Sequence, residues 1–176
     1  LLANEEISAG ETINVVVPTG NFGNILAAYF AKRMGLPIGK LICASNDNKV
    51  LYDFFRTGTY DRNREFMLTS SPSMDILISS NLERLIYLST GCDAEANKAL
   101  MAELSRKGSY TVTPKMREAM ADFWGNFASQ EENAAEIKRV FTDMGYLMDT
   151  HTGVASAAYQ KYVKENGDTA KTVIVS

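Results

Sequence analysis

The sequence predicts an α/β fold in three α/β/α layers, with helices on both faces of a mainly parallel sheet. Strand-like and helix-like segments alternate at both ends of the chain. The strand-like segments are short β-branched apolar runs, which are typical of strands buried on both faces. A glycine-rich turn joins the first of these runs to a helix, as in sheets that bind ligands at their carboxyl edge. With 176 residues, 45% of them hydrophobic, the chain is long enough for one domain.

The first third of the chain predicts two strand–helix pairs. Residues Ile13–Val17 form the first strand, and Asn24–Met34 form a helix that is apolar on nearly all sides. Lys40–Ser45 form the next strand, and a second helix runs over about Val50–Arg56. This order predicts neighbouring parallel strands joined by a crossover helix.

The middle of the chain is predicted to be helical. Ser80 and Glu83 have the spacing of a capping box, and Asp93 can cap a further helix. Thr113 followed by proline marks another helix start. That helix is expected to continue through four apolar residues at helical spacing, which are Met116, Met120, Phe123 and Phe127.

The last third predicts two helices and two strands. Ser129 and Glu132 form a second capping box. The helix that follows has a predicted core stripe of Ala134, Ile137, Phe141 and Met144. Beyond it we expect a strand at 146–149, a helix at 153–164 and a final strand at 171–176.

Composition narrows the possible functions. A net charge of −3 without a basic block argues against a nucleic-acid surface, and no apolar run is long enough to span a bilayer. Cys43 and Cys92 are expected to be buried free thiols of a cytoplasmic protein, because their spacing suits no metal site. The single histidine, His151, excludes a metal cluster built from several histidines. Because no methionine precedes Leu1 and the final strand ends the chain, residues 1–176 are interpreted as one domain within a longer protein.

The turn "PTGNFGN" is the strongest functional signal. Gly20 and Gly23 let backbone N–H groups face inward, and the helix start adds unpaired N–H donors with a partial positive charge. Asn21 and Asn24 add amide donors. The pattern therefore favours an anion site, most naturally for phosphate.

Two other interpretations of this turn stay open. Its glycines would also suit a tight turn whose only role is close packing. Asp47 follows the second strand, where a ribose-binding acid of a nucleotide site would lie. The turn itself is neither G-x-G-x-x-G nor a P-loop.

Several stretches of the chain, in order, resemble the threonine synthase family of pyridoxal-phosphate (PLP) enzymes. The stretch "PTGNFGNILAAYFAKRMGLPI" resembles the family's phosphate-binding loop and following helix. "SSPSMDI", "SSNLERL" and "MDTHTGVA" resemble further stretches, and "VIVS" resembles the strand before the last active-site segment. The glycine loop is shared with dehydratases and β-replacement enzymes, which remain the alternative, whereas "SPSMD" is more specific to threonine synthase.

The resemblance implies a lyase of fold type II. Such enzymes convert O-phospho-L-homoserine and water into L-threonine and phosphate, using pyridoxal 5'-phosphate. It implies that the cofactor phosphate binds the loop residues, which are Gly20, Asn21, Phe22, Gly23 and Asn24. Ser73, Asp75, Asn81 and Arg84 are candidate substrate-binding residues. The serines and Asp75 would equally suit a hydrogen-bonded turn, and Asn81 and Arg84 the exposed first turn of a helix.

The chain departs from the family in one respect. The Schiff-base lysine of these enzymes lies upstream of the glycine loop, in a Phe-Lys-Asp-like stretch that does not occur here. The partner of the pyridine nitrogen is expected at or beyond Ser176. We therefore expect no catalytic residue in this chain, no activity of the chain alone, and no catalytic role for His151.

Overall fold

A computed structural model describes residues 2–176 and confirms the predicted α/β fold. Four strands form one sheet in the order β5-β2-β1-β6, and every neighbouring pair is parallel. They are β1 (Ile13–Pro18), β2 (Ile38–Ser45), β5 (Phe123–Phe127) and β6 (Thr172–Ile174). The most buried strands, β1 and β2, lie at the centre of the sheet, as their continuous apolar runs predict.

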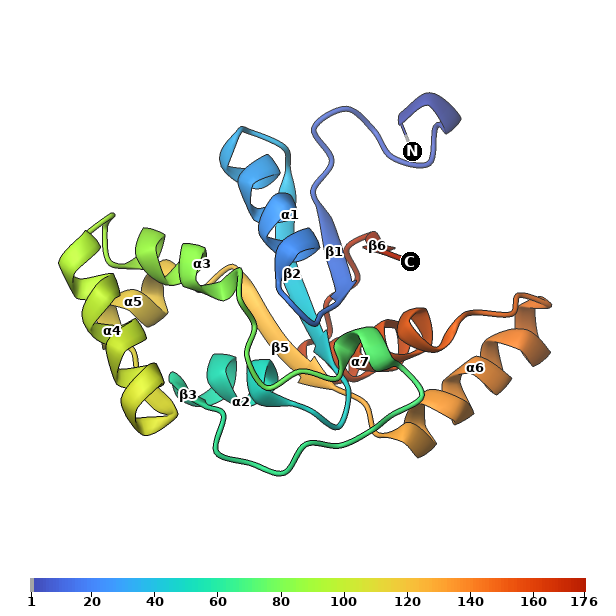
Figure 1. Ribbon diagram of the computed structural model, residues 1–176. Helices are drawn as coiled ribbons and strands as arrows, with labels where there is room; N and C mark the ends of the chain where they lie inside the picture. Colours follow the sequence, from blue (N-terminus) through green and yellow to red (C-terminus); the bar gives the residue numbers. More distant parts are fainter. Residues whose placement is uncertain (1) are drawn as a thin grey trace.

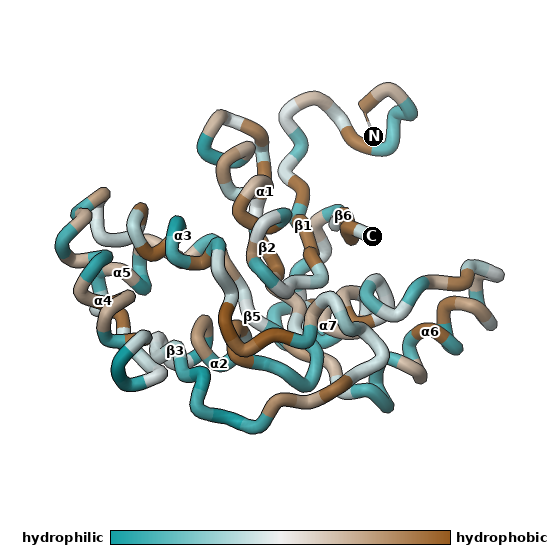
Figure 2. The backbone as a smooth tube through the Cα atoms, viewed as in Figure 1, coloured by the Kyte–Doolittle hydropathy of each residue, from teal (hydrophilic) through white to brown (hydrophobic). Residues whose placement is uncertain are grey.

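Helices cover both faces of the sheet. Helices α1 (Gly23–Arg33) and α2 (Val50–Thr57) pack on one face, with Val15 and Val17 of β1. Helix α7 (Thr150–Asn166) packs on the other face, with Val16, and α6 (Gln130–Met144) packs against α7. Figure 2 shows hydrophobic residues along the central strands and mixed colours along the outlying helices α4 and α6.

A group of small elements extends the face covered by α1 and α2. Figure 1 shows α3, α4 and α5 together on the left, while α6 lies on the right. These elements are α3 (Leu82–Ser89), α4 (Ala94–Lys107), α5 (Pro114–Ala119), and the antiparallel pair β3 (Thr59–Asp61) and β4 (Ser109–Thr111). Two 3₁₀ turns complete the chain, η1 (Leu2–Asn4) and η2 (Pro72–Met74).

The predicted helix beyond Thr113 is wrong in its second half. Helix α5 ends at Ala119, and Phe123–Phe127 form the edge strand β5, with Gly125 opposite Cys43 of β2. Apolar residues 4, 3 and 4 apart fit a helix, but the aromatic residues of this segment are also strong strand formers. Pairing with β2 and stacking of Phe123 on Phe55, with ring centroids 5.4 Å apart, outweigh the helical spacing.

Four smaller predictions are also wrong. The segment 146–149 has no strand pairing and leads directly into α7. Helix α3 begins after Asn81 without a side-chain cap, so Ser80 and Glu83 form no capping box. The predicted core stripe of α6 is wrong, because Ala134 is exposed and Phe141 and Met144 are 54% and 76% exposed, whereas the buried residues of this helix are Asn133, Glu136 and Val140. Cys92 is exposed, whereas Cys43 is buried as predicted. The second capping box, Ser129 with Glu132, is confirmed.

Among residues 2–176, no helix combines the length and the apolar character that crossing a membrane requires.

Candidate anion-binding site

The glycine-rich turn lies at the carboxyl edge of the sheet, where β1 ends at Pro18 and α1 begins at Gly23. It surrounds a cavity of about 290 Å³. Residues 17–25 and Ser73 line this cavity. No lysine is among these lining residues. The cavity therefore lies at the turn for which the sequence predicts an anion site.

A run of backbone N–H groups in the turn has no hydrogen-bond acceptor. Within residues 2–176, nothing accepts from the N–H groups of residues 20–25, and α1 has no side-chain cap. The first hydrogen bond of the helix runs from Leu26 N to Phe22 O, at 3.2 Å. Adjacent donors at a helix start, on the wall of a cavity, favour binding of an anion.

The turn is shaped by a strained phenylalanine rather than by its glycines. Phe22 has φ 65° and ψ 10°, in the left-handed region that non-glycine residues rarely adopt. Its side chain is only 1% exposed, and its ring lies 5.5 Å from that of Phe123 and 6.0 Å from that of Phe55. Burial of the ring therefore holds the backbone in a conformation that it would not adopt unaided.

The two glycines have different roles. A Cβ atom on Gly20 would lie 2.5 Å from the carbonyl oxygen of Ser73, so only glycine allows this close contact. A Cβ atom on Gly23 would meet nothing closer than the Asn81 amide nitrogen, at 3.7 Å. Gly20 is needed for packing, whereas Gly23 keeps the approach to the N–H groups free of a side chain.

Residues after η2 hold the glycine-rich turn by donating hydrogen bonds to carbonyl groups of the turn. Ser79 Oγ donates to Gly20 O at 2.8 Å. The Asn81 backbone and side-chain nitrogens both donate to Asn21 O, at 3.2 and 2.9 Å. These contacts use the acceptors of the turn and leave its N–H donors free. Asn81, a candidate from the sequence, thus lies beside the loop, and Ser79 is a residue that sequence reasoning missed.

Asp75 is the centre of a separate polar network. Its carboxylate accepts from the side chains of Asn46, Asn48 and Thr69 at 2.7 to 3.0 Å, and from Thr69 N at 2.8 Å. The network ties the chain before η2 to the carboxyl end of β2. Sequence reasoning did not single out Asn46 or Asn48, although asparagines directly after a buried strand are a usable signal for this edge. Of the four substrate candidates, Asp75 is the one most fully occupied by structural contacts.

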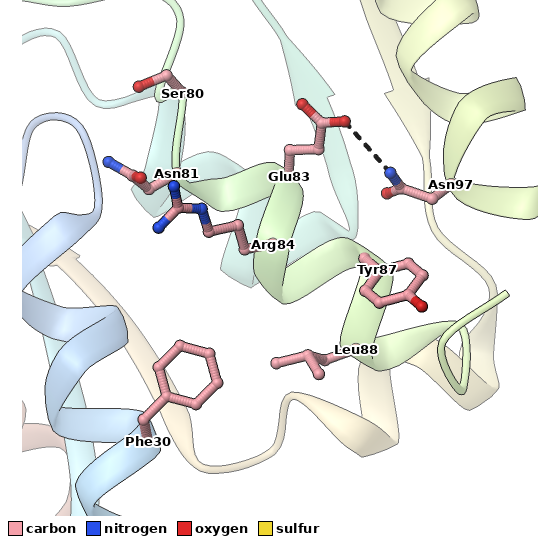
Figure 3. Close-up of a pocket in the computed structure, with 8 residues that line it drawn as sticks. All are labelled: Phe30, Ser80, Asn81, Glu83, Arg84, Tyr87, Leu88 and Asn97. Carbon is pink, nitrogen blue, oxygen red and sulfur yellow. Dashed lines mark hydrogen bonds between the residues drawn. The ribbon is translucent and has the colours of Figure 1, made fainter. Parts of the chain in front are cut away.

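A second, larger cavity is lined by two of the substrate candidates, Asn81 and Arg84. It has a volume of about 710 Å³ and lies between α1 and α3. Figure 3 shows the Arg84 guanidinium pointing toward Asn81, whereas Glu83 turns to Asn97, which donates to it at 3.3 Å. Arg84 is exposed and forms no ion pair within residues 2–176. An unpaired guanidinium beside an amide can bind a carboxylate or a phosphate.

Two aspartates at this edge accept hydrogen bonds from backbone N–H groups at the starts of helices. Asp47 accepts from Gln130 N at 3.2 Å, at the start of α6, so the acid considered for a ribose has a structural partner. Asp149 caps α7, accepting from His151 N and Thr152 N. Hydrogen bonds, chiefly from the Thr152 hydroxyl, lower the pKa of Asp149 to about 2.

Comparison with known proteins finds similar sequences among the threonine synthases. The chain is 45% identical over 157 residues to "Threonine synthase-like 1" of Macaca fascicularis, covering 88% of this chain and 21% of that protein. It is 40% identical over 170 residues to threonine synthase of Saccharomyces cerevisiae, covering 89% of this chain and 33% of the yeast protein. The chain is thus similar to a segment of these threonine synthase and threonine synthase-like proteins. No family model matches it.

Solved structures of threonine synthases show the same similarity. The crystal structure of PLP-bound threonine synthase from Brucella melitensis superposes with a TM-score of 0.89 and 39% identity, over 98% of this chain and 36% of that one. The chain therefore spans about a fifth to a third of the length of the threonine synthase relatives that it matches. The fold type II architecture expected from the sequence is confirmed by this superposition.

Proposed function

We propose that this chain is the phosphate-binding part of a pyridoxal-phosphate-dependent threonine synthase. The whole enzyme would be a lyase that converts O-phospho-L-homoserine and water into L-threonine and phosphate. The observation that carries the proposal is the row of free backbone N–H groups at residues 20–25, around a cavity at the carboxyl edge of the sheet.

The residues present fit the phosphate of the cofactor. Gly20, Asn21, Phe22, Gly23 and Asn24 would hold it through backbone N–H groups and the uncapped start of α1. The absence of a side chain at Gly23 would leave room for the phosphate oxygens. Bound pyridoxal phosphate would supply an electron sink for proton removal from the substrate. The loop residues would bind and orient the cofactor.

Arg84 and Asn81 would bind the phosphate of O-phospho-L-homoserine. The Arg84 guanidinium offers a fork of donors and carries no competing ion pair within residues 2–176. Asn81 links this site to the loop, because its amide donates to Asn21 O. Ser73, which lines the loop cavity, is the third substrate candidate. We keep Asp75 as the weakest candidate, since its carboxylate already has several donors.

We predict that the 176-residue chain alone releases no phosphate from O-phospho-L-homoserine. No lysine lines either the loop cavity or the cavity at Arg84, so the chain offers no group for covalent attachment of the cofactor there. Phosphate release by the purified chain with added cofactor, measured against a no-protein blank, checks this. Turnover that disappears when one lysine of the chain is replaced would contradict it.

The experiment for the function uses a full-length protein that contains this chain. Release of phosphate from O-phospho-L-homoserine is compared with deamination of L-threonine and L-serine, which a dehydratase would prefer. In the same protein, Arg84→Ala should raise KM for O-phospho-L-homoserine about tenfold or more, with smaller effects on cofactor retention. Lys98→Ala, on the exposed side of α4, is the matched control. Preference for threonine or serine would refute the proposed reaction.

A further inference from the structure

His151 is a partly buried side chain that the proposed function does not use. It is the only histidine of the chain and lies in the first turn of α7. Its ring bridges two segments that are far apart in the sequence. Nδ1 lies 3.2 Å from Asp149 Oδ1, and Nε2 accepts from the backbone N–H of Ser73 at 3.3 Å.

The partners of the ring define its tautomer. Asp149 is ionised at neutral pH, since hydrogen bonds lower its pKa to about 2, and an ionised carboxylate can only accept. Nδ1 must therefore carry the hydrogen that points to Asp149. Nε2 is then left with a lone pair, which is what the Ser73 N–H requires.

Ser73 connects this histidine to the anion-binding turn. Its carbonyl oxygen is the atom that lies 2.5 Å from where a Cβ on Gly20 would be, and the residue also lines the 290 Å³ cavity. On the other side of Ser73, the Asp75 network fixes the chain to β2. The hydrogen bond to His151 fixes it from the side of α7. A shift of Ser73 would therefore move the wall of the cavity and the contact with Gly20.

We propose that His151 is a positioning residue, which holds the Ser73 backbone against Gly20 and thereby sets the shape of the anion-binding turn. The inference rests on the proposed function of that turn. It gives α7 a role at a site with which the helix shares no other direct hydrogen bond among residues 2–176. His151 touches no reacting group in this account and acts only through Ser73.

Three substitutions at one position test the inference. His151→Gln places an amide oxygen near the position of Nε2, so it can still accept from Ser73 N. His151→Asn keeps an amide near Asp149 but is too short to reach Ser73, and His151→Ala loses both contacts. The Asp149 cap accepts from the backbone N–H groups of residues 151 and 152, so all three variants keep it and differ only in the side-chain contacts of position 151.

The measurement is the affinity of the chain for inorganic phosphate at pH 8, from shifts of the backbone amide signals of residues 20–25. His151→Asn and His151→Ala should bind phosphate about threefold to tenfold more weakly, the size of effect expected when one hydrogen bond is lost. His151→Gln should bind within about twofold of the parent chain. The Ser73 amide proton should exchange faster in the Asn and Ala variants only.

The outcomes separate this inference from the proposed function. If the parent chain shows no phosphate-dependent shifts at residues 20–25, the proposed function of the turn fails. If the parent binds there and all three variants bind equally, the turn is a site but His151 does not position it. Equal losses in the Gln and Asn variants would likewise overturn the inference, because the length of the side chain would then not matter.

Discussion

Helices α1 and α7 begin at the same edge of the sheet, but the backbone N–H groups at their starts differ in whether they have hydrogen-bond acceptors. Asp149 caps α7, accepting from His151 N at 2.8 Å and from Thr152 N at 3.2 Å, and Gly153 N donates to its carbonyl. At α1, nothing within residues 2–176 accepts from residues 20–25. The chain thus provides acceptors for N–H groups at the start of α7, whereas the N–H groups at the start of α1 stay without acceptors at the wall of a cavity.

The difference has an energetic meaning. A capped start contributes stability to the folded chain, whereas an open start leaves donors that water or a ligand must satisfy. The α1 turn also contains the left-handed Phe22, a conformation of the kind that clusters at ligand sites. We infer that the α1 start is maintained for binding and that the α7 start is maintained for stability. The predictions below are ordered by the size of the expected effect.

The largest effect is expected for Phe22→Ala. The ring is 1% exposed and packs on two other phenylalanine rings, so its loss should lower the free energy of unfolding by about 3 to 4 kcal/mol. Denaturant unfolding of the chain measures this. Phe66→Ala removes a ring that is 49% exposed and should cost much less. A loss below about 1 kcal/mol for Phe22→Ala would mean that burial does not hold the turn.

An intermediate effect is expected at the first glycine of the turn. Gly20→Ala should destabilise the chain by about 1 to 3 kcal/mol, because the new methyl group meets the Ser73 carbonyl oxygen 2.5 Å away. Gly23→Ala should leave stability within about 1 kcal/mol, since its nearest neighbour would lie 3.7 Å away. Thermal unfolding of the two variants makes the comparison. Equal losses at both positions would contradict the different roles assigned to the glycines.

The smallest effect compares the two helix starts directly. Asp149→Ala should lower the free energy of unfolding by about 1 kcal/mol, the usual value of a side-chain cap. Asn24→Ala, in the first turn of α1, should leave it nearly unchanged, because the Asn24 side chain makes no capping bond. Urea unfolding at pH 7 measures both changes. A larger loss at Asn24 than at Asp149 would reverse the comparison.

The pH dependence of the Asp149 effect follows from its lowered pKa. The folded value is about 2, below the ordinary value of about 4, so the cap is fully effective above pH 4 or so. Its contribution is lost as the pH falls toward 2, where the carboxylate becomes protonated in the folded chain as well. The difference in stability between the parent chain and Asp149→Ala should therefore shrink over this range.

The sequence predicts the central part of the fold because local signals and tertiary structure agree there. The β-branched runs at β1 and β2 and the capping box of Ser129 with Glu132 all have a local physical cause. Strand β5 was missed because pairing with β2 overrides a helical spacing, and only the neighbouring strand shows which pattern applies.

The site was predictable in part, for a related reason. The position of the loop follows from contiguous residues, so the sequence reveals it. The left-handed Phe22 depends on rings from α2 and β5, and the contact of Gly20 depends on Ser73, both distant in the chain. The roles of Asp75, Ser79 and His151 come from such long-range hydrogen bonds, which a single sequence does not encode as a local pattern.

One titration tests most directly whether the open start of α1 binds phosphate. Backbone amide signals of the ¹⁵N-labelled chain are followed while pyridoxal phosphate is added, and again with pyridoxal, which lacks the phosphate. We predict saturable shifts at residues 20–25 with pyridoxal phosphate, much smaller shifts there with pyridoxal, and little change at the capped residues 150–153. Equal shifts with both compounds, or shifts at α7 without shifts at α1, would contradict the account.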